Sequence, residues 1–137
     1  MTLSPQEKQS LSDIRMGKAV EFQEDALENF SRGRYRTAVN RAYYSVLNAA
    51  RSLLILEGLN PETHDGIVTM LSLHFIKKQI LPLEIIKIYK ILLSRRTDVD
   101  YGDFDALVKE EAENSVIIAK KAVTIIDELR ISLKKEL

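Results

Sequence analysis

The sequence predicts an all-α fold, namely an antiparallel up-and-down bundle of four long helices plus one short helix. Glycine and proline, which often interrupt helices, number only five and three among 137 residues and leave long stretches between them. Within those stretches apolar residues recur at steps of three and four, the period of an amphipathic helix. Because this length supports one hydrophobic core and not two, we expect a single domain over residues 1–137.

The first two helices follow from apolar stripes on either side of Gly33. The first stripe consists of Met16, Ala19, Phe22, Ala26 and Phe30. The second stripe runs from Tyr35 to Leu56, and a parallel row beside it contains Tyr43, Leu47, Ala50 and Leu54. A helix that is apolar over so much of its girth is expected at the centre of the bundle, where its alanines let neighbouring helices approach closely.

The remaining helices are a short third one, over about residues 65–75, and two long ones. The fourth starts at Pro82, a favoured first-turn residue. Its apolar stripe consists of Ile85, Ile88, Ile91 and Leu92. The last helix has apolar or small residues at steps of three and four between Ala112 and Leu133. The segments "EIIKIYKILL" and "SVIIA" are compatible with strands, but both lie in longer windows of helical period.

Composition excludes several classes of protein. Lysine plus arginine and aspartate plus glutamate both number 20, so the net charge is zero and any nucleic-acid contact must be local. The absence of cysteine removes disulfides, thiol nucleophiles and zinc–thiolate sites. The chain opens with the polar segment "MTLSPQEKQSLSD", and no apolar run approaches the ~20 residues that span a bilayer. We therefore expect a cytoplasmic protein without membrane contact.

Metals and cofactors are not expected either. The two histidines, His64 and His74, have no neighbouring cysteines, and a metal site would need carboxylates supplied by the fold. Glycine-rich phosphate loops, nucleophile elbows and His-Glu-x-x-His motifs are also absent from the sequence.

The stretch "NRAYYSVLNAARSLLILEG" places tyrosines and arginines inside the central helix. Arg41, Tyr44 and Arg51 are spaced three and seven residues apart and therefore share a helix face. Tyr43 lies on the apolar stripe, so we expect it to pack in the core with its hydroxyl hydrogen-bonded at the rim. For the other three, a surface role and a place on the same side of the bundle as the loop after the fourth helix both remain open.

A second cluster, "RRTDVDYGDF", covers residues 95–104 at the end of the fourth helix. Arginines suit the negative end of a helix dipole, and aspartates suit the following turn, so a structural role is sufficient to explain it. A functional role is also consistent, because arginine binds phosphate in a bidentate manner, and Asp and Tyr beside it complete a grip on a phosphodiester.

A third cluster, "SRGRYR" at residues 31–36, is a basic turn between the first two helices. A solvated loop explains it, but it is also the most concentrated positive charge in the chain. If RNA binds, salt-dependent phosphate contacts could come from this turn.

These segments, in this order, resemble the HEPN domain family (higher eukaryotes and prokaryotes nucleotide-binding). The resemblance runs from about residue 26 to about residue 101. It rests on "GRYRTAVNRAYYSVLNAARSLLILEG", "THDGIV" and "RRTDVDY". The first is similar to the family's Tyr-Tyr-small-x-hydrophobic-x-Ala-Ala-Arg stretch, the second to its His-x-Gly element, and the third to the Arg-x-x-x-Asp-Tyr ending of one branch.

The resemblance implies an α-helical bundle that commonly dimerises, with the end of the fourth helix near a cleft between protomers. Many members are ribonucleases, and many are encoded beside a minimal nucleotidyltransferase as toxin and antitoxin. The ribonuclease branch carries Arg, four to six residues, then His. This sequence departs from that pattern, because no histidine falls in the window after Arg95 or Arg96.

The candidate site residues follow from the motifs and the resemblance together. The candidate catalytic residues are Arg96, Asp100 and Tyr101, and the candidate ligand-binding residues are Arg95, Arg41, Tyr44, Arg51 and His64. A phenol with a pKa near 10 is a poor general base, so Tyr101 would serve as an acid or hydrogen-bond donor. His64 would supply the missing imidazole if the fold brings its loop near Arg96.

Four functions remain open at this point. The first is a homodimeric module that binds a nucleotide, an RNA end or a nucleotidyltransferase partner. The second is a metal-independent endoribonuclease toxin. In the third, Tyr101 is a target for nucleotide attachment by the partner enzyme, and in the fourth the chain is purely a dimerisation module. On the fourth helix, Ile88 and Tyr89 are candidates for the dimer contact.

Overall fold

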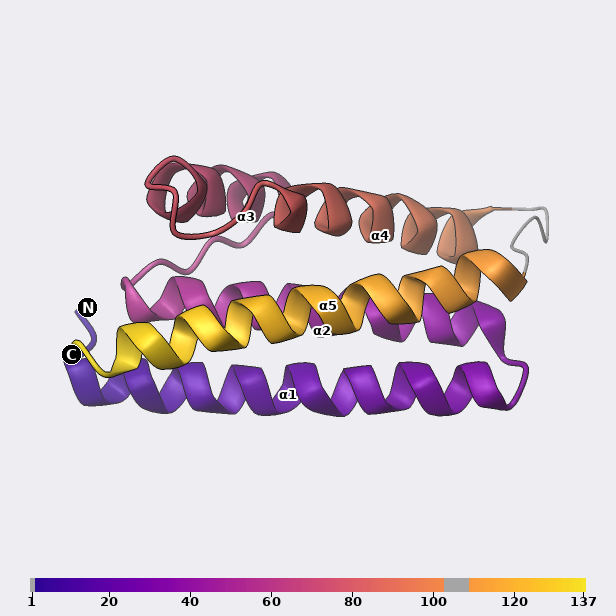
Figure 1. Ribbon diagram of the computed structural model, residues 1–137, viewed down its shortest axis with the longest axis horizontal. Helices are drawn as coiled ribbons and strands as arrows, with labels where there is room; N and C mark the ends of the chain where they lie inside the picture. The colour runs from indigo at the N-terminus through magenta and orange to yellow at the C-terminus, as the bar shows by residue number, and fades with distance from the viewer. Residues whose placement is uncertain (1, 103–108) are drawn as a thin grey trace.

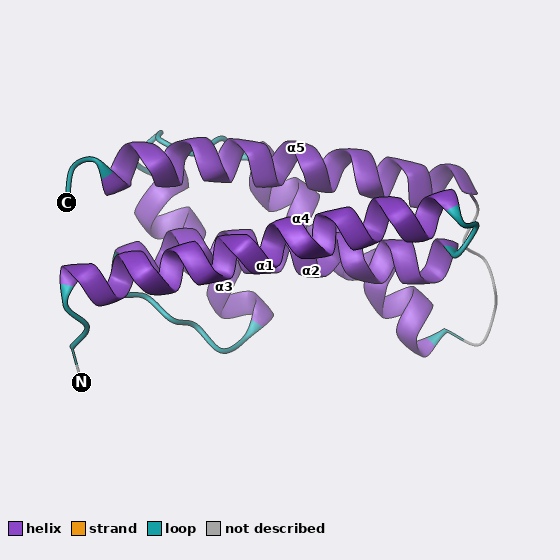
Figure 2. Ribbon diagram, turned by 90° about the horizontal axis from the view of Figure 1, so that it is seen from below, coloured by secondary structure: helices purple, strands orange, loops and turns teal. Residues whose placement is uncertain are grey.

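The structure is a computed structural model that describes residues 2–102 and 109–137. All regular elements in these ranges are helical, which confirms the all-α prediction (Figures 1 and 2). In chain order they are α1 (Pro5–Ser31), α2 (Tyr35–Leu56), α3 (His64–Leu71), the π-helical turn η1 (Ser72–Ile76), α4 (Glu84–Tyr101) and α5 (Lys109–Lys134). The four long helices alternate in direction along the bundle (Figure 1).

Helix α1 begins at a capping box. The Ser4 hydroxyl accepts from the Glu7 backbone N–H at 3.1 Å, while the Ser4 N–H donates to the Glu7 carboxylate at 2.9 Å. Pro5 occupies the first helical position, where its missing N–H costs nothing. The cap therefore extends α1 well before Met16, the first residue of the predicted stripe.

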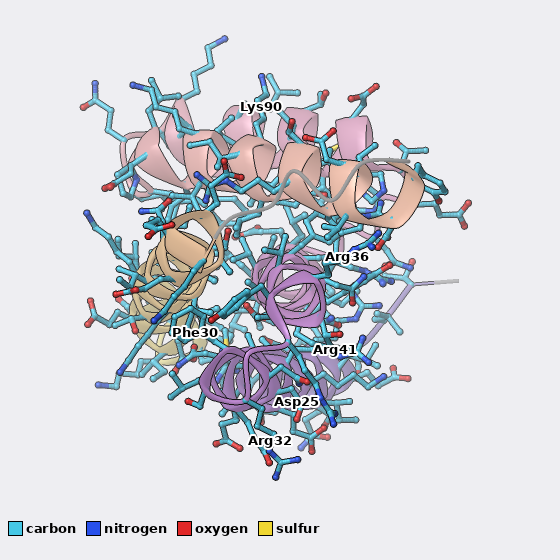
Figure 3. The ribbon with its side chains drawn as sticks, turned by 90° about the vertical axis from the view of Figure 1, so that its right-hand side faces the viewer. Asp25, Phe30, Arg32, Arg36, Arg41 and Lys90 are labelled. Atoms are coloured by element: carbon cyan, nitrogen blue, oxygen red, sulfur yellow. The ribbon has the colours of Figure 1, made fainter. Side chains whose placement is uncertain are left out.

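Helix α2 lies at the centre of the bundle and contacts α1, α5, α4 and α3. Its alanines at positions 38, 42, 49 and 50 are fully buried, which allows the close approach of its neighbours. Figure 3 shows α1 and α4 on opposite sides of α2 with α5 on a third side, while Arg36 and Arg41 lie on the remaining side. We call this remaining side, between α1 and α4, the open face of α2.

The α3 region turns the chain from α2 to α4. Thr63 caps α3 by accepting from the Gly66 N–H at 2.9 Å, and α3 then continues into η1. The prediction that the fourth helix starts at Pro82 was wrong by two residues, since α4 begins at Glu84. Pro82 lies just before it, and its carbonyl accepts from the Ile85 N–H in the entering turn.

The main hydrophobic core draws residues from every helix, and its largest fully buried side chains include Tyr43, Tyr89 and Phe75. This overturns one expectation about the dimer contact. Ile88 and Tyr89 are buried within the protomer, so neither is available to a partner. The large aliphatic side chains that α4 and its entering turn expose are Ile91 and Leu83, and α4 also exposes the Tyr101 ring.

Candidate functional site

Arg96 lies against the two adjacent tyrosines of α2. Its guanidinium carbon is 5.0 Å from the ring centroid of Tyr43 and 5.9 Å from that of Tyr44. Asp100, one helical turn further along α4, accepts from Arg96 at 3.2 Å. The side chain of Arg96 is only 12% exposed, and its buried Nε has no hydrogen-bond partner among the described residues. Stacking and one carboxylate therefore hold this guanidinium without using all of its donors.

Tyr43 joins this arginine to His64. The Tyr43 hydroxyl lies 2.5 Å from His64 Nδ1 and 3.3 Å from the Tyr89 hydroxyl, and the Tyr89 hydroxyl lies 3.2 Å from the same nitrogen. The expectation that Tyr43 packs in the core with a hydrogen-bonded hydroxyl is confirmed. Burial raises the pKa of Tyr43 and of Tyr89, so both phenols are neutral at physiological pH.

His64 is the first residue of α3 and is itself exposed. A phenol oxygen can accept a hydrogen bond from Nδ1–H, and in that tautomer Nε2 keeps a free lone pair. Nε2 makes no hydrogen bond to residues 2–102 or 109–137. The fold thus brings His64 to the tyrosine on which Arg96 stacks, as the ribonuclease hypothesis requires, although no direct contact joins His64 to Arg96 in those ranges.

A cavity of about 290 Å³ lies on the open face, where α2 begins and α4 ends. Its lining residues are Arg36, Thr37, Asn40, Arg41, Val99 and Asp100. Arg36 donates to the Val99 carbonyl at 2.6 Å, and Arg41 donates to the Asn40 side chain at 2.9 Å. Neither arginine forms an ion pair within the described parts of the chain. This cavity therefore holds two positive charges that carboxylates do not neutralise.

Arg41, Tyr44 and Arg51 share the open face, but they meet different neighbours. Arg41 lines the first cavity together with Asp100, and Tyr44 lies beside Arg96 in the C-terminal half of α4. Arg51 instead lines a second cavity, of about 220 Å³, together with His64 and the loop before α3. From the sequence, it remained open whether these three residues lie on the side of the loop after α4. Arg41 lies near that end of α4, whereas Arg51 lies near the opposite end of α2.

The other candidate residues lie apart from this face. Arg95 points toward α5, where it donates to the Asn114 and Ser115 side chains at 2.9 Å each. Tyr101 is 75% exposed and makes no side-chain hydrogen bond to the described residues. Its role as a target for nucleotide attachment stays a prediction. Residues 103 and 104 of the predicted cluster lie outside the described residues.

Sequence reasoning missed two members of the site. Tyr89 is a core residue by its helical spacing, and nothing local indicates that its hydroxyl meets Tyr43 and His64. Phe22 of α1 packs on Tyr44 with ring centroids 5.7 Å apart and lies 5.8 Å from the Arg41 guanidinium. Only the pairing of α1 with α2 around their connecting turn could have revealed that contact.

The sequence model of the HEPN domain matches residues 13–129, which cover most of the chain. The chain belongs to the HEPN domain family. The match includes the tyrosine pair of α2, the Thr63–Gly66 cap and the whole of α4, so the site described above lies inside the HEPN domain.

Curated relatives agree with this membership. A Methanocaldococcus jannaschii protein named "Putative toxin" is 32% identical over 105 residues, covering 74% of this chain and 72% of that protein. A Thermotoga maritima protein named UPF0332 is 30% identical over 121 residues, covering 88% of this chain and 89% of its own length. A UPF0332 protein of Pyrococcus horikoshii is 46% identical over 50 residues, which are 36% of this chain and one third (33%) of that protein.

Two further structural observations concern metal ligands and membrane spans. Across residues 2–102 and 109–137, no three metal-binding His, Cys, Asp or Glu side chains come together. Over the same ranges, the helices are all too short or too polar to cross a lipid bilayer.

Proposed function

We propose that this HEPN protein is the toxin-type member of a toxin–antitoxin pair and binds the phosphates of RNA or nucleotides on the open face of α2. The observation that supports it most directly is the basic cavity at Arg36 and Arg41, next to the Arg96 guanidinium stacked on Tyr44. Arginines supply phosphate contacts, and the half-buried Tyr44 ring supplies a surface on which a base stacks. The toxin-named relative supports the biological context.

The partner side of the proposal rests on the family and on surface composition. Many HEPN members are encoded beside a minimal nucleotidyltransferase as toxin and antitoxin, and we propose such a partner here. We also propose a homodimer, because two apolar side chains are exposed here: Leu83 just before α4 and Ile91 within it. An adjacent gene for a small nucleotidyltransferase would support the pairing, and its absence from the neighbourhood would count against it.

Charge-removing variants test the binding proposal. We expect Arg41→Gln and Arg96→Gln each to weaken the binding of a short single-stranded RNA about tenfold and to flatten its salt dependence. Lys120→Gln is a control, because Lys120 is an exposed cation on α5. Fluorescence anisotropy over a salt series measures all three. Equal losses in all three variants would mean that binding follows overall charge rather than this face.

A second function, a metal-independent endoribonuclease, is favoured by one specific observation. The Nδ1 of His64 lies within hydrogen-bond distance of the two phenols and the residue is exposed, which is the arrangement of an oriented acid–base group. His64 would take the proton of the ribose 2′-hydroxyl as that oxygen attacks the adjacent phosphorus. A cyclic phosphate forms as the P–O bond to the 5′-oxygen breaks, the departing 5′-oxygen takes a proton from solvent water, and Arg96 would stabilise the phosphorane charge.

Substitution of the imidazole separates this function from binding alone. If the protein is a ribonuclease, His64→Gln lowers the cleavage rate by about 10²-fold or more while leaving RNA affinity close to that of the unchanged protein. Chelators should have no effect on the rate. If the unchanged protein leaves tRNA and mRNA intact and its expression is harmless to cells, the ribonuclease reading is wrong.

A further inference from the structure

Two arginines from different helices lie side by side at the other end of the open face. Arg15 of α1 donates to the Arg51 backbone carbonyl at 3.4 Å. Both guanidiniums also reach the same acceptor, the side-chain oxygen of Asn60, at 3.1 Å from Arg15 and 3.5 Å from Arg51. One neutral oxygen thus serves two positive charges.

No carboxylate neutralises this pair within the described residues. By contrast, Arg32, Arg96 and Arg130 each form an ion pair at 3.2 Å or less. Glu57 and Glu62 line neighbouring cavities but pair with neither Arg15 nor Arg51. The Nε of Arg51 is buried without a hydrogen-bond partner. Adjacent, partly buried cations repel each other, so this arrangement lacks one negative charge.

The electrostatics of the arginine pair and the cavities beside it both suit a bound anion. Burial, and then the charge of Arg51, lower the pKa of Arg15, as expected where a cation has no counterion. A cavity of about 560 Å³ is lined by Lys8, Arg15 and Asn60 among others. A second cavity is lined by Arg51 and His64 among others. Two guanidinium forks with free donors suit an anion with several oxygens, which is the chemistry of a phosphate.

We infer that Arg15, Arg51 and Asn60 form a second phosphate subsite and that the ligand is therefore a single RNA strand rather than a mononucleotide. The inference rests on the proposed function, which provides the first subsite at Arg41 and Arg96. Arg41 and Arg51 are ten residues apart on one helix, a rise of about 15 Å. A stacked strand advances about 3.4 Å per nucleotide, so roughly four or five nucleotides connect the two subsites, with Tyr44 between them.

Replacing Asn60 by aspartate tests the subsite without removing a side chain from the fold. The new carboxylate would occupy the position between the two guanidiniums and supply the missing charge. We expect Asn60→Asp to raise Tm by about 2 to 4 °C. We also expect it to weaken binding of a ten-nucleotide single-stranded RNA about tenfold, because the phosphate position is then occupied. Misfolding cannot produce this combination, since it would lower Tm.

A matched control and a simpler probe accompany that variant. Asn114→Asp adds the same charge beside Arg95 on the α5 side, and we expect its RNA affinity to equal that of the unchanged protein. Inorganic phosphate should raise the Tm of the unchanged protein more than sodium chloride does at equal ionic strength. Asn60→Asp should abolish that difference.

A length series separates this inference from the proposed function. Affinity for ATP and for RNAs of increasing length is compared between the unchanged protein and the double variant Arg15→Gln, Arg51→Gln. We expect the unchanged protein to gain affinity steeply once the RNA reaches roughly five nucleotides, as the second subsite is filled. The double variant should lose that gain, keep its affinity for ATP, and show a salt slope smaller by about 0.7.

The possible outcomes distinguish failure of the second subsite from failure of the proposed function. If ATP binds as tightly as long RNA and Asn60→Asp changes neither affinity, the second subsite is refuted while the proposed function stands. If the unchanged protein binds neither ATP nor RNA, the proposed function fails, and this inference fails with it.

Discussion

Gly66 allows the cap of α3 to form and thereby places His64 beside the buried tyrosines. A Cβ at position 66 would lie 2.9 Å from the Thr63 hydroxyl and 3.1 Å from the Pro61 Cβ, so a side chain there displaces the capping residue. The His-x-Gly element noticed in the sequence thus has a physical basis, because the glycine makes room for the cap that begins the helix at the histidine.

Gly66→Ala is expected to destabilise the protein by roughly 1 kcal/mol, the usual cost of losing an N-cap. Gly17→Ala is the matched control, since Gly17 lies exposed inside α1 with nothing within 4 Å of a new Cβ. We expect it to stabilise by about 0.5 to 1 kcal/mol, because alanine is the better helix former. Chemical denaturation measures both. Equal stabilisation by the two substitutions would show that the cap does not constrain position 66.

The buried phenols predict a loss of stability in alkali. Burial raises the pKa of Tyr89 above its ordinary value of 10.0, so the folded state resists ionisation that the unfolded chain allows. The sign follows by linkage: this contribution is fully present below pH 10 and is lost as pH rises from there toward the folded pKa. We expect Tyr89→Phe to show a shallower fall in unfolding free energy above about pH 10 than the unchanged protein. If the unfolding free energies of the two proteins fall in parallel above pH 10, this prediction is wrong.

Neighbouring arginines on α4 show what the orientation of a helix decides. Arg95 reaches the polar side chains of α5, and Arg96 reaches the tyrosines of α2. In the sequence both are equally good candidates for a phosphate ligand. Which of the two faces the open side depends on how α4 is rotated about its axis, and that rotation follows from burial of Ile85, Tyr89 and Leu92.

Helix α5 is attached to α1 by a buried arginine. Arg130 donates to Asp13 of α1 at 2.7 Å and to Asp127 of its own helix at 2.9 Å. We expect Arg130→Ala to destabilise the fold by about 2 kcal/mol, because the buried arginine loses its hydrogen bonds to two charged groups while Asp13 keeps Lys134 as a counterion. Lys134→Ala removes a second cation from Asp13 but from an exposed position, so its cost should stay below about 1 kcal/mol. Thermal denaturation measures the loss of stability in both variants. Equal losses would show that burial of Arg130 contributes nothing to stability.

On the scale of the whole molecule, the exposed apolar residues of the α3–α4 layer predict where two copies meet. Leu83 and Ile91 are 55% and 42% exposed, unlike the predicted contacts Ile88 and Tyr89. We expect Ile91→Glu to convert a dimer to a monomer in analytical ultracentrifugation, because a charge would be buried at the contact. Ile117→Glu, at an exposed isoleucine of α5, should leave the assembly unchanged. A monomeric unchanged protein would overturn the proposed homodimer.

The sequence by itself determined the helices, the central place of α2, the burial of Tyr43 and the HEPN resemblance. These follow from local patterns, since apolar periodicity, caps and turn residues act over a few positions along one helix. Two tertiary contacts could also have been anticipated. Phe22 and Tyr44 are each eleven residues from Gly33, and Arg15 and Arg51 are each eighteen, so an antiparallel hairpin folded at that glycine brings both pairs together.

Only the tertiary structure decided which of the polar residues act together. Tyr43, His64 and Tyr89 come from three helices and converge within 3.3 Å, and no local pattern encodes such a meeting. The shared acceptor of Arg15 and Arg51 is likewise supplied by Asn60, from a loop. The reason is that long-range packing sets the rotation and axial position of each helix, and these two variables decide which polar side chains reach one another across the bundle.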